Sequence, residues 1–415
     1  MSHLGLVSAT AAAAKGFRVV GFDPDAALIA SLEQGRLPVV EPDLDELVAA
    51  NRERLSFTAD PGDLAACDLV YIARDVPTDD QGQSDLGPIE ELMALVRGAR
   101  RPQALLVILC QVPPGFSRRQ PGPKGGLYYQ VETLIFGRAV ERALKPERFI
   151  VGCPDPTQPL PPALAEYLKA FGCPILPMRF ESAELAKIAI NCCLVSSISV
   201  ANTLAELCEG IGADWREIAP ALRLDRRIGA YAYLAPGLGI AGGNLERDLA
   251  TVVRLGSAQG SDVGVVRSWL ANSGHRRFWA LRTLHAQVLD VGEEPVIAVL
   301  GLAYKENTAS TKNSPSLALI ANLRPFALQV FDPVVPAAAA QHPRLRGAES
   351  ALQACQGADA LVIMTPWPEF ARLEPAEIAQ ALRGKVVIDP YGVLKGPACL
   401  QAGLRYFTLG APALT

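Results

Sequence analysis

The sequence predicts an α/β protein in which two Rossmann-like parallel-sheet domains are joined by a helical central domain with a long connecting helix. Three observations along the 415 residues lead to this prediction. Short apolar runs alternate with helical segments in the first third, a long helical stretch begins after Ser182, and strand–helix alternation resumes in the last third. Such alternation implies right-handed crossovers and an open parallel sheet.

The first predicted domain covers residues 1–181. Its strand candidates are apolar on both faces, which is typical of a parallel sheet that is covered on both sides. The predicted strands are Arg18–Phe22, Asp68–Ala73 and Leu105–Cys110. Helical spacing of apolar residues predicts helices over Ala26–Glu33, Leu44–Asn51 and Ile89–Gly98.

The central domain is predicted over residues 182–291 and the last domain over residues 292–415. Ala183–Ile211 reads as one apolar helix that is rich in small residues and free of Pro. A long helix between two α/β halves suits a dimerisation surface, and a buried spacer helix is the alternative. The strands predicted for the last domain are Pro295–Leu300, Leu328–Phe331, Ala360–Met364 and Val386–Asp389.

Composition narrows the expected partners. The formal net charge is -4 and no long basic run occurs, which argues against nucleic acid and favours small molecules and further copies of the chain. The nine cysteines and four histidines form no metal-ligand pattern, so no metal is expected. Unpatterned cysteines favour a reducing cytoplasm. No apolar run reaches the roughly 20 residues of a membrane span, and Met1–Lys15 does not resemble a signal peptide.

The first domain carries part of a dinucleotide-binding signature. Such a unit needs a strand, a Gly-rich turn, a helix, a second strand, and an acid that binds the ribose hydroxyls. Asp23 ends the run Arg18–Phe22, and Gly5 precedes the small-residue stretch Ser8–Ala14. The first strand and the first two glycines are missing, so we expect the true start to lie upstream of Met1. The alternative is that Gly5 is only a turn residue.

Seven segments spread over essentially the whole chain carry recognisable motifs. They are Pro38–Leu47, Asp75–Leu86, Gln111–Gly115, Ala183–Asn191, Leu224–Gly229, Gly301–Pro315 and Ala358–Phe370. Two of them are fairly specific, GLAYKENTASTKNSP and AELAKIAIN. Together the segments resemble the UDP-glucose/GDP-mannose dehydrogenase family, which has G-L-A-F-K-x-x-T-x-D-x-R-x-S-P and a helix start A-E-x-x-K-x-x-x-N at these places.

The resemblance implies a chemistry. Members of the family use NAD to oxidise the C6 alcohol of a nucleotide sugar to a carboxylate, with the aldehyde held on a cysteine between two hydride transfers. By this resemblance Lys187 stabilises the developing oxyanion, and Asn191 hydrogen-bonds the reacting oxygens. Asp248 orients water or transfers a proton. Seen alone, Lys187 with Asn191 could be a solvated helix pair, and Asp248 with Arg247 a surface ion pair.

Further residues follow by resemblance as binding residues. Lys305, Gly239 and Arg227 are expected at the nucleotide sugar, Arg227 by reaching across a dimer interface. UDP-glucose is the default substrate, and a homodimer is the expected assembly. The residues expected at NAD are Gly5, Asp23, Pro77, Thr78, Gln111 and Lys312.

The chain differs from the family's motifs at the positions that the resemblance assigns to the second oxidation. The family's G-x-G-G-S-C-F-P-K-D corresponds to GIAGGNLERD, with Asn244 at the position of the cysteine. An amide cannot replace a thiolate nucleophile. In Val131–Gly137, Glu132 is retained, but Phe136 replaces the glutamate expected to assist thioester hydrolysis. Cys192 and Cys193 are read as core residues.

These departures leave three functions open. The first is an NAD-dependent nucleotide-sugar dehydrogenase with altered second-step chemistry. The second is a non-catalytic nucleotide-sugar-binding relative. The third is a hydroxyacid dehydrogenase that shares only the Rossmann half, against which the segment GLAYKENT argues.

Overall fold

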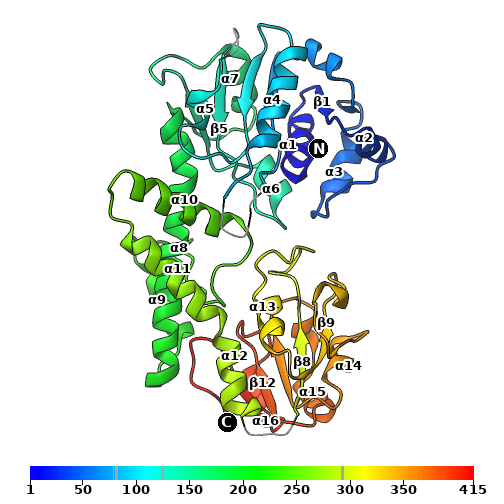
Figure 1. Cartoon of the computed structure of the whole chain (residues 1–415), viewed down its shortest axis with the longest axis vertical. Coiled ribbons are helices and arrows are strands. Elements are labelled where there is room, and N and C mark those ends of the chain that lie inside the picture. Colours follow the sequence, from blue (N-terminus) through cyan, green and yellow to red (C-terminus); the bar gives the residue numbers. More distant parts are fainter. Residues whose placement is uncertain (78, 80–82, 123–125, 291–293) are drawn as a thin grey trace. The chain divides into compact units, whose positions relative to one another are not determined.

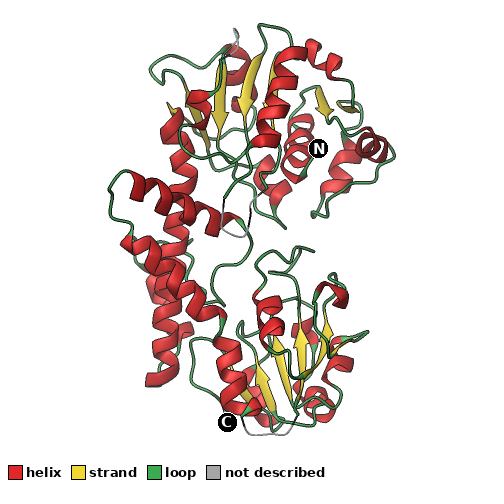
Figure 2. Cartoon of the chain, viewed as in Figure 1, coloured by secondary structure: helices red, strands yellow, loops and turns green. Residues whose placement is uncertain are grey.

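The computed structural model describes residues 1–77, 79, 83–122, 126–290 and 294–415 (Figures 1 and 2). The chain divides into two compact units, Met1–Ile190 and Asn191–Thr415. Both are built from strands and helices, which confirms the predicted α/β class. Thr78 and the predicted domain boundary at residues 291–292 lie outside the described residues.

The first unit contains a five-stranded sheet, in the order β3-β4-β5-β6-β7, and a separate parallel pair, β1-β2. All ladders are parallel except β5 with β6, which the sequence did not predict. The strands are β1 (Val19–Phe22), β2 (Leu55–Thr58), β3 (Leu69–Ile72), β4 (Leu105–Ile108), β5 (Leu127–Gln130), β6 (Phe149–Cys153) and β7 (Ile175–Arg179). The helices are α1 (His3–Ala14), α2 (Ala26–Glu33), α3 (Leu44–Ala50), α4 (Gly87–Ala99), α5 (Phe116–Arg119), α6 (Ala139–Leu144), α7 (Pro162–Lys169) and α8 (Phe180–Ile211).

Strand β4 shows why these runs are apolar throughout. Successive side chains of a strand point to opposite faces. Leu106 and Ile108 belong to the core that includes Met93 of α4, whereas Leu105 and Val107 belong to the core beneath α7. Helices cover both faces, as the sequence predicted for a buried parallel strand.

Helix α1 begins at His3, earlier than the predicted stretch Ser8–Ala14, and Gly5 lies within it. The alternative that Gly5 is a turn residue is therefore wrong. A Cβ atom at Gly5 would lie 2.8 Å from the carbonyl oxygen of Ala73, just after β3. Because glycine has no Cβ atom, α1 can lie close to the backbone that follows β3. Among the described residues, no ladder joins β1 to β3.

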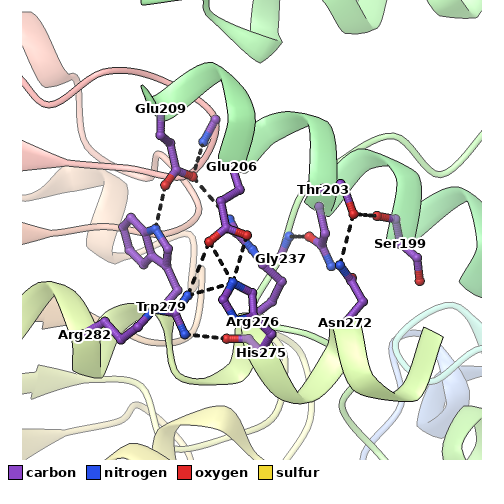
Figure 3. A network of polar contacts seen from close by, with 12 residues as sticks. Ser199, Thr203, Glu206, Glu209, Gly237, Asn272, His275, Arg276, Trp279 and Arg282 are labelled. Carbon is purple, nitrogen blue, oxygen red and sulfur yellow. Dashed lines mark hydrogen bonds and ion pairs between the residues drawn. The ribbon is translucent and has the colours of Figure 1, made fainter. Parts of the chain in front are cut away.

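Helix α8 continues into the second unit, where acidic side chains fix its last turns (Figure 3). The buried Arg276 donates to Glu209 at 3.2 Å and pairs with Glu206 at 3.1 Å. Glu209 also accepts from Nε1 of Trp279 at 2.8 Å and from the backbone N–H of Gly410 at 3.0 Å. Among the described residues, α8 is the one helix long and apolar enough to cross a membrane by length and composition. Its last two acids, Glu206 and Glu209, bind segments of the second unit.

The second unit ends in a six-stranded parallel sheet of order β10-β9-β8-β11-β12-β13. This order, 3-2-1-4-5-6 in local numbering, is that of a Rossmann fold. The strands are β8 (Val296–Leu300), β9 (Ala327–Phe331), β10 (Leu345–Gly347), β11 (Ala360–Ile363), β12 (Val386–Ile388) and β13 (Arg405–Phe407). The helices are α9 (Trp215–Leu224), α10 (Asn244–Ala258), α11 (Gly264–Arg277), α12 (Trp279–Leu284), α13 (Pro315–Asn322), α14 (Ala351–Cys355), α15 (Pro375–Ala381) and α16 (Gly396–Gln401).

Candidate functional site

A glycine loop leads into α10 and carries the position of the expected nucleophile. Gly239 has φ +80°, and a Cβ atom there would lie 2.4 Å from the carbonyl oxygen of Ser273, so only glycine fits. Asn244 is the first residue of α10 and is exposed. Asp248 follows one turn later on the same side of the helix and is buried.

Asn191 and Arg247 both contact Asp248 inside the second unit. Nδ2 of Asn191, on α8, donates to its Oδ2 at 2.5 Å. Nε of Arg247 lies 3.4 Å from its Oδ1, and both side chains of this pair are almost fully buried. The alternative of a surface ion pair is therefore wrong. The carboxylate is held in one orientation, as a group that directs a water or a proton must be.

The two cysteines after Asn191 face different surroundings. Cys192 packs against the small core that contains Val195 and Leu249. Burial, and then the charge of Asp248, raises the pKa of its thiol to about 11, which keeps it protonated and a poor nucleophile. Cys193 is exposed, so reading it as a core residue was wrong. Successive residues of a helix point about 100° apart, so that α8 buries one of the pair and exposes the other.

Lys187, one turn before Asn191 on α8, forms an ion pair within the first unit. Its Nζ lies 3.3 Å from Oε2 of Glu132, with side-chain exposures of 13% and 14%. A solvated surface pair is thereby excluded. Phe136 is 41% exposed and stacks on the ring of His3 at a centroid distance of 4.2 Å. The apolar ring offers no acid at the position where the family has its glutamate.

Two buried acids that the sequence did not single out join the motif segments. Glu184 of α8 accepts from the backbone N–H groups of Gly115 at 2.5 Å and Ser117 at 2.8 Å, and so holds the turn of QVPPG. Burial raises the pKa of Glu184, although these N–H groups act in the opposite direction. Glu41 similarly accepts from Gly137 at 3.1 Å and Ala139 at 2.7 Å, next to Phe136. Glu41 lies in the motif segment Pro38–Leu47 and Glu184 in Ala183–Asn191. This position within a motif was the signal in the sequence that could have pointed to them.

Three of the residues expected at NAD follow strands of the first unit, two of them the paired parallel strands β3 and β4. Asp23 follows β1, Pro77 follows β3, and Gln111 follows β4. The carboxyl ends of parallel strands form one edge of a sheet, where ligands of this fold bind. One oxygen of Asp23 accepts from the backbone N–H of Asp25 at 3.0 Å, and the other pairs with the amino group of Met1. An acid after β1, Asp23, and a glycine in α1, Gly5, are features of a dinucleotide-binding fold.

Lys305 and Lys312 lie in the loop after β8, the strand beside which the order of the last sheet reverses. This point is the expected ligand crevice of a Rossmann sheet. Nζ of Lys305 lies 5.6 Å from the centre of the Tyr304 ring. The backbone N–H of Gly242 donates to the carbonyl of Lys312 at 3.1 Å, which joins the glycine loop to this segment.

Asp332, after β9, holds the start of the same loop. In a cofactor-binding Rossmann unit an acid here would bind a ribose. Its Oδ2 instead accepts from the backbone N–H groups of Leu302 at 2.6 Å and Ala303 at 3.1 Å, and from Nε1 of Trp367 at 3.1 Å. Asp332 is thus a loop-holding residue that the sequence did not reveal.

Arg227 is the most exposed of the expected substrate residues. Its side chain is 88% exposed, and its NH2 lies 2.6 Å from Oδ2 of Asp225 in the same turn.

Among the described residues, no group of three or more metal-binding side chains occurs.

Comparison with known proteins gives consistent matches along the chain. Models of the UDP-glucose/GDP-mannose dehydrogenase family match in three parts: the NAD binding domain at residues 1–166, the central domain at 181–272 and the UDP binding domain at 298–396. The UDP-glucose 6-dehydrogenase TuaD of Bacillus subtilis is 30% identical over 429 residues, covering 99% of this chain and 92% of the relative. AglM, a UDP-glucose 6-dehydrogenase of Haloferax volcanii, is 31% identical over 412 residues, covering 93% and 94%.

A solved structure agrees with this assignment. The UDP-glucose dehydrogenase of Pyrobaculum islandicum superimposes with a TM-score of 0.83 at 28% identity, and the match covers 96% of each chain. The matched NAD binding domain makes NAD the cofactor of the first half. On these grounds, and with the motif segments held together as described, the chain belongs to the UDP-glucose/GDP-mannose dehydrogenase family.

Proposed function

We propose that the chain is an NAD-dependent dehydrogenase that oxidises the C6 alcohol of UDP-glucose to the aldehyde, and performs the second oxidation slowly and without a covalent intermediate. Residues 1–181 bind NAD, residues 182–291 dimerise, and residues 292–415 bind the nucleotide sugar. One observation carries the proposal: Lys187, Asn191 and Asp248 are retained, the last two buried and Lys187 13% exposed, whereas Asn244 and Phe136 replace the thiol and the acid.

The first oxidation needs few groups. The C6 hydroxyl loses its proton as its carbon loses a hydride, and bound NAD supplies the hydride acceptor. Lys187 stabilises the alkoxide that develops on the oxygen. Asp248, oriented by Asn191 at 2.5 Å, accepts the proton directly or through a water.

The second oxidation is slow because it lacks covalent capture. A thiolate would hold the aldehyde carbon in place and position its hydride. Asn244 cannot do so, and the pKa of about 11 keeps Cys192 a thiol. The aldehyde must therefore add water and be oxidised as its hydrate, or leave the site.

The test is to incubate the protein with NAD and UDP-glucose, count NADH per sugar consumed and identify the product. We expect about one NADH per sugar at early times, the C6 aldehyde as product, and no sugar adduct on any cysteine by intact-mass analysis. Two NADH per sugar without release of aldehyde, or a cysteine adduct, would overturn the mechanism. A Lys187→Met variant should lower the rate by about 10²–10³-fold, as loss of an oxyanion donor does.

The competing function is a nucleotide-sugar-binding protein without turnover. It predicts that UDP-glucose binds, as measured by calorimetry, while no NADH forms. The oriented Asn191–Asp248 pair favours turnover, because binding alone does not require a proton acceptor.

For the assembly we propose a homodimer in which a second copy covers one side of α8. Val200, Leu204, Leu207 and Ile211 are 53%, 40%, 54% and 66% exposed. Their spacing of four, three and four residues is that of a seam between packed helices. In a dimer with a twofold axis, the same surface of both copies meets, so this seam would pack against the seam of the second copy.

Further exposed apolar side chains lie at the end of α9 and just after it, near Arg227 in the sequence. Leu224 is 85% and Tyr231 is 96% exposed, and Arg227 stands between them. A partner over this segment would bring Arg227 to the partner's substrate. Leu207→Glu with Ile211→Glu should yield monomers in analytical ultracentrifugation, whereas Leu400→Glu, at an exposed leucine of α16, should not. Unchanged dimers in the double variant, or a monomeric native protein, would overturn this assembly.

For the compartment we propose the cytoplasm. All nine cysteines are free thiols, which suits a reducing environment.

A further inference from the structure

Glu246 stands where the family run has a proline, in the first turn of α10. It is three-quarters buried and takes part in a small polar cluster. Its Oε1 accepts from NH2 of Arg277, at the end of α11, at 2.7 Å. Its Oε2 accepts from Nδ2 of Asn313, in the loop before α13. The acid therefore joins three segments that are distant in sequence.

The two donors that Glu246 holds also bind the glycine loop. NH2 of Arg277 donates to the carbonyl of Ile240 at 2.9 Å, and Nδ2 of Asn313 donates to the carbonyl of Gly242 at 2.9 Å. Each of these nitrogens carries two hydrogens, so each can serve Glu246 with one and the loop with the other. The carboxylate thereby sets the direction of both donors.

We propose that Glu246 is a positioning residue that presets the glycine loop against residues 304–313 before substrate arrives. It acts through Arg277 and Asn313 and touches no reacting atom, since α10 directs it away from the side that carries Asn244 and Asp248. The inference rests on the proposed function, because Gly239 and Lys305, which are expected at the nucleotide sugar, belong to these two segments. A preset loop loses less conformational entropy on binding and so increases affinity.

The test replaces Glu246 with the residue of the family run. Glu246→Pro removes the carboxylate and suits the first turn of a helix. Glu246→Gln keeps the shape and loses the charge. Backbone hydrogen exchange of residues 239–243 should become about tenfold faster in Glu246→Pro and less so in Glu246→Gln, because each tenfold corresponds to about 1.4 kcal/mol of lost protection. Glu377→Gln, at an exposed first-turn acid of α15, is the matched control and should exchange like the native protein.

Affinity gives the second readout. The Kd for UDP-glucose, by calorimetry, should rise about tenfold in Glu246→Pro. Asn313→Ala should reproduce the effect, and the double variant should add little to it, because both act on one cluster. Native exchange in both Glu246 variants, or additive effects in the double variant, would overturn the proposal. Exchange needs no ligand, so it decides the role of Glu246 even if the native protein forms no NADH and the proposed function fails.

Discussion

Asn191 and Asp248 come from two helices and form a short hydrogen bond at the candidate site of the second unit. Nδ2 of Asn191 donates to Oδ2 of Asp248 at 2.5 Å, and both residues are buried. A buried carboxylate is costly unless it is hydrogen-bonded. The amide therefore makes it possible for Asp248 to remain in the interior in one orientation.

Asn191→Ala should weaken both stability and turnover. Removing the amide takes one hydrogen-bond donor away from a buried carboxylate, which costs about 1–3 kcal/mol of unfolding free energy. The urea midpoint and the rate of NADH formation measure the two effects. Asn322→Ala, at an exposed asparagine of α13 that bonds only within its helix, is the control. Equal losses in both variants would contradict a special role for Asn191.

Asn244→Cys should trap the sugar without restoring the full reaction. A thiol at the first residue of α10 benefits from the helix N-terminus, which lowers its pKa and favours attack on the aldehyde. Phe136 leaves the resulting thioester without its hydrolytic acid, so NADH should stop near two equivalents per enzyme, with an adduct visible by mass. Asn244→Cys combined with Phe136→Glu should turn over. Sustained formation of two NADH per sugar by Asn244→Cys alone would show that Phe136 is irrelevant.

The regular α/β pattern could be read from the sequence where a segment is uniformly apolar. Strand β4 lies inside the predicted Leu105–Cys110, and α2 has the predicted bounds. The pattern failed at β7 (Ile175–Arg179), which contains Pro177 and exposes several side chains. An edge strand need not alternate or be apolar, and its proline can face outward. Strand β5 was missed because its tyrosines and glutamine do not form an apolar run.

The candidate site was predictable only as a set of residue types. The resemblance named Lys187, Asn191 and Asp248, but no pattern in the chain relates Glu184 to Gly115, which lies 69 residues away. Such contacts depend on the crossover that places α8 beside the loop. The burial of Asp248, which decides between a surface pair and an oriented acid, likewise required coordinates.

Gly239→Ala should destabilise the glycine loop, whereas Gly237→Ala should be nearly neutral. A methyl group at Gly239 would lie 2.4 Å from the carbonyl oxygen of Ser273, at φ +80°. At Gly237 no heavy atom lies within 4 Å of the added carbon. Strain of this kind costs about 1–3 kcal/mol. Thermal midpoints and UDP-glucose affinity should both fall for Gly239→Ala, and similar values for the two variants would contradict the close approach.

Asp332 should make the stability of the second unit depend on pH in the acid range. Burial raises its pKa, but four backbone N–H groups outweigh burial, and the net effect is a lowered pKa. The folded state then holds fewer protons than the unfolded state, so the contribution is present above the unfolded pKa of about 3.9 and is lost as pH falls through the folded pKa.

Asp332→Asn should therefore lower the unfolding free energy by about 1–3 kcal/mol at pH 7. The difference from the native protein should shrink as pH falls below about 4. Urea midpoints between pH 7 and pH 3 measure it, with the exposed Asp45→Asn as control. A difference that grows toward low pH would have the wrong sign.

The acids at the end of α8 have a consequence for synthesis on the ribosome. Glu209 binds Trp279, 70 residues later in the chain, and Gly410, 201 residues later. At about 5–20 residues per second, these partners emerge about 4–14 s and about 10–40 s after Glu209 itself. During that interval the long apolar helix α8 has been synthesised, but Glu209 lacks these hydrogen-bond donors and the side of α8 that later packs on them is exposed to solvent. Nascent chains that pause before α11 is made are thus the ones most prone to aggregate or to be held by a chaperone.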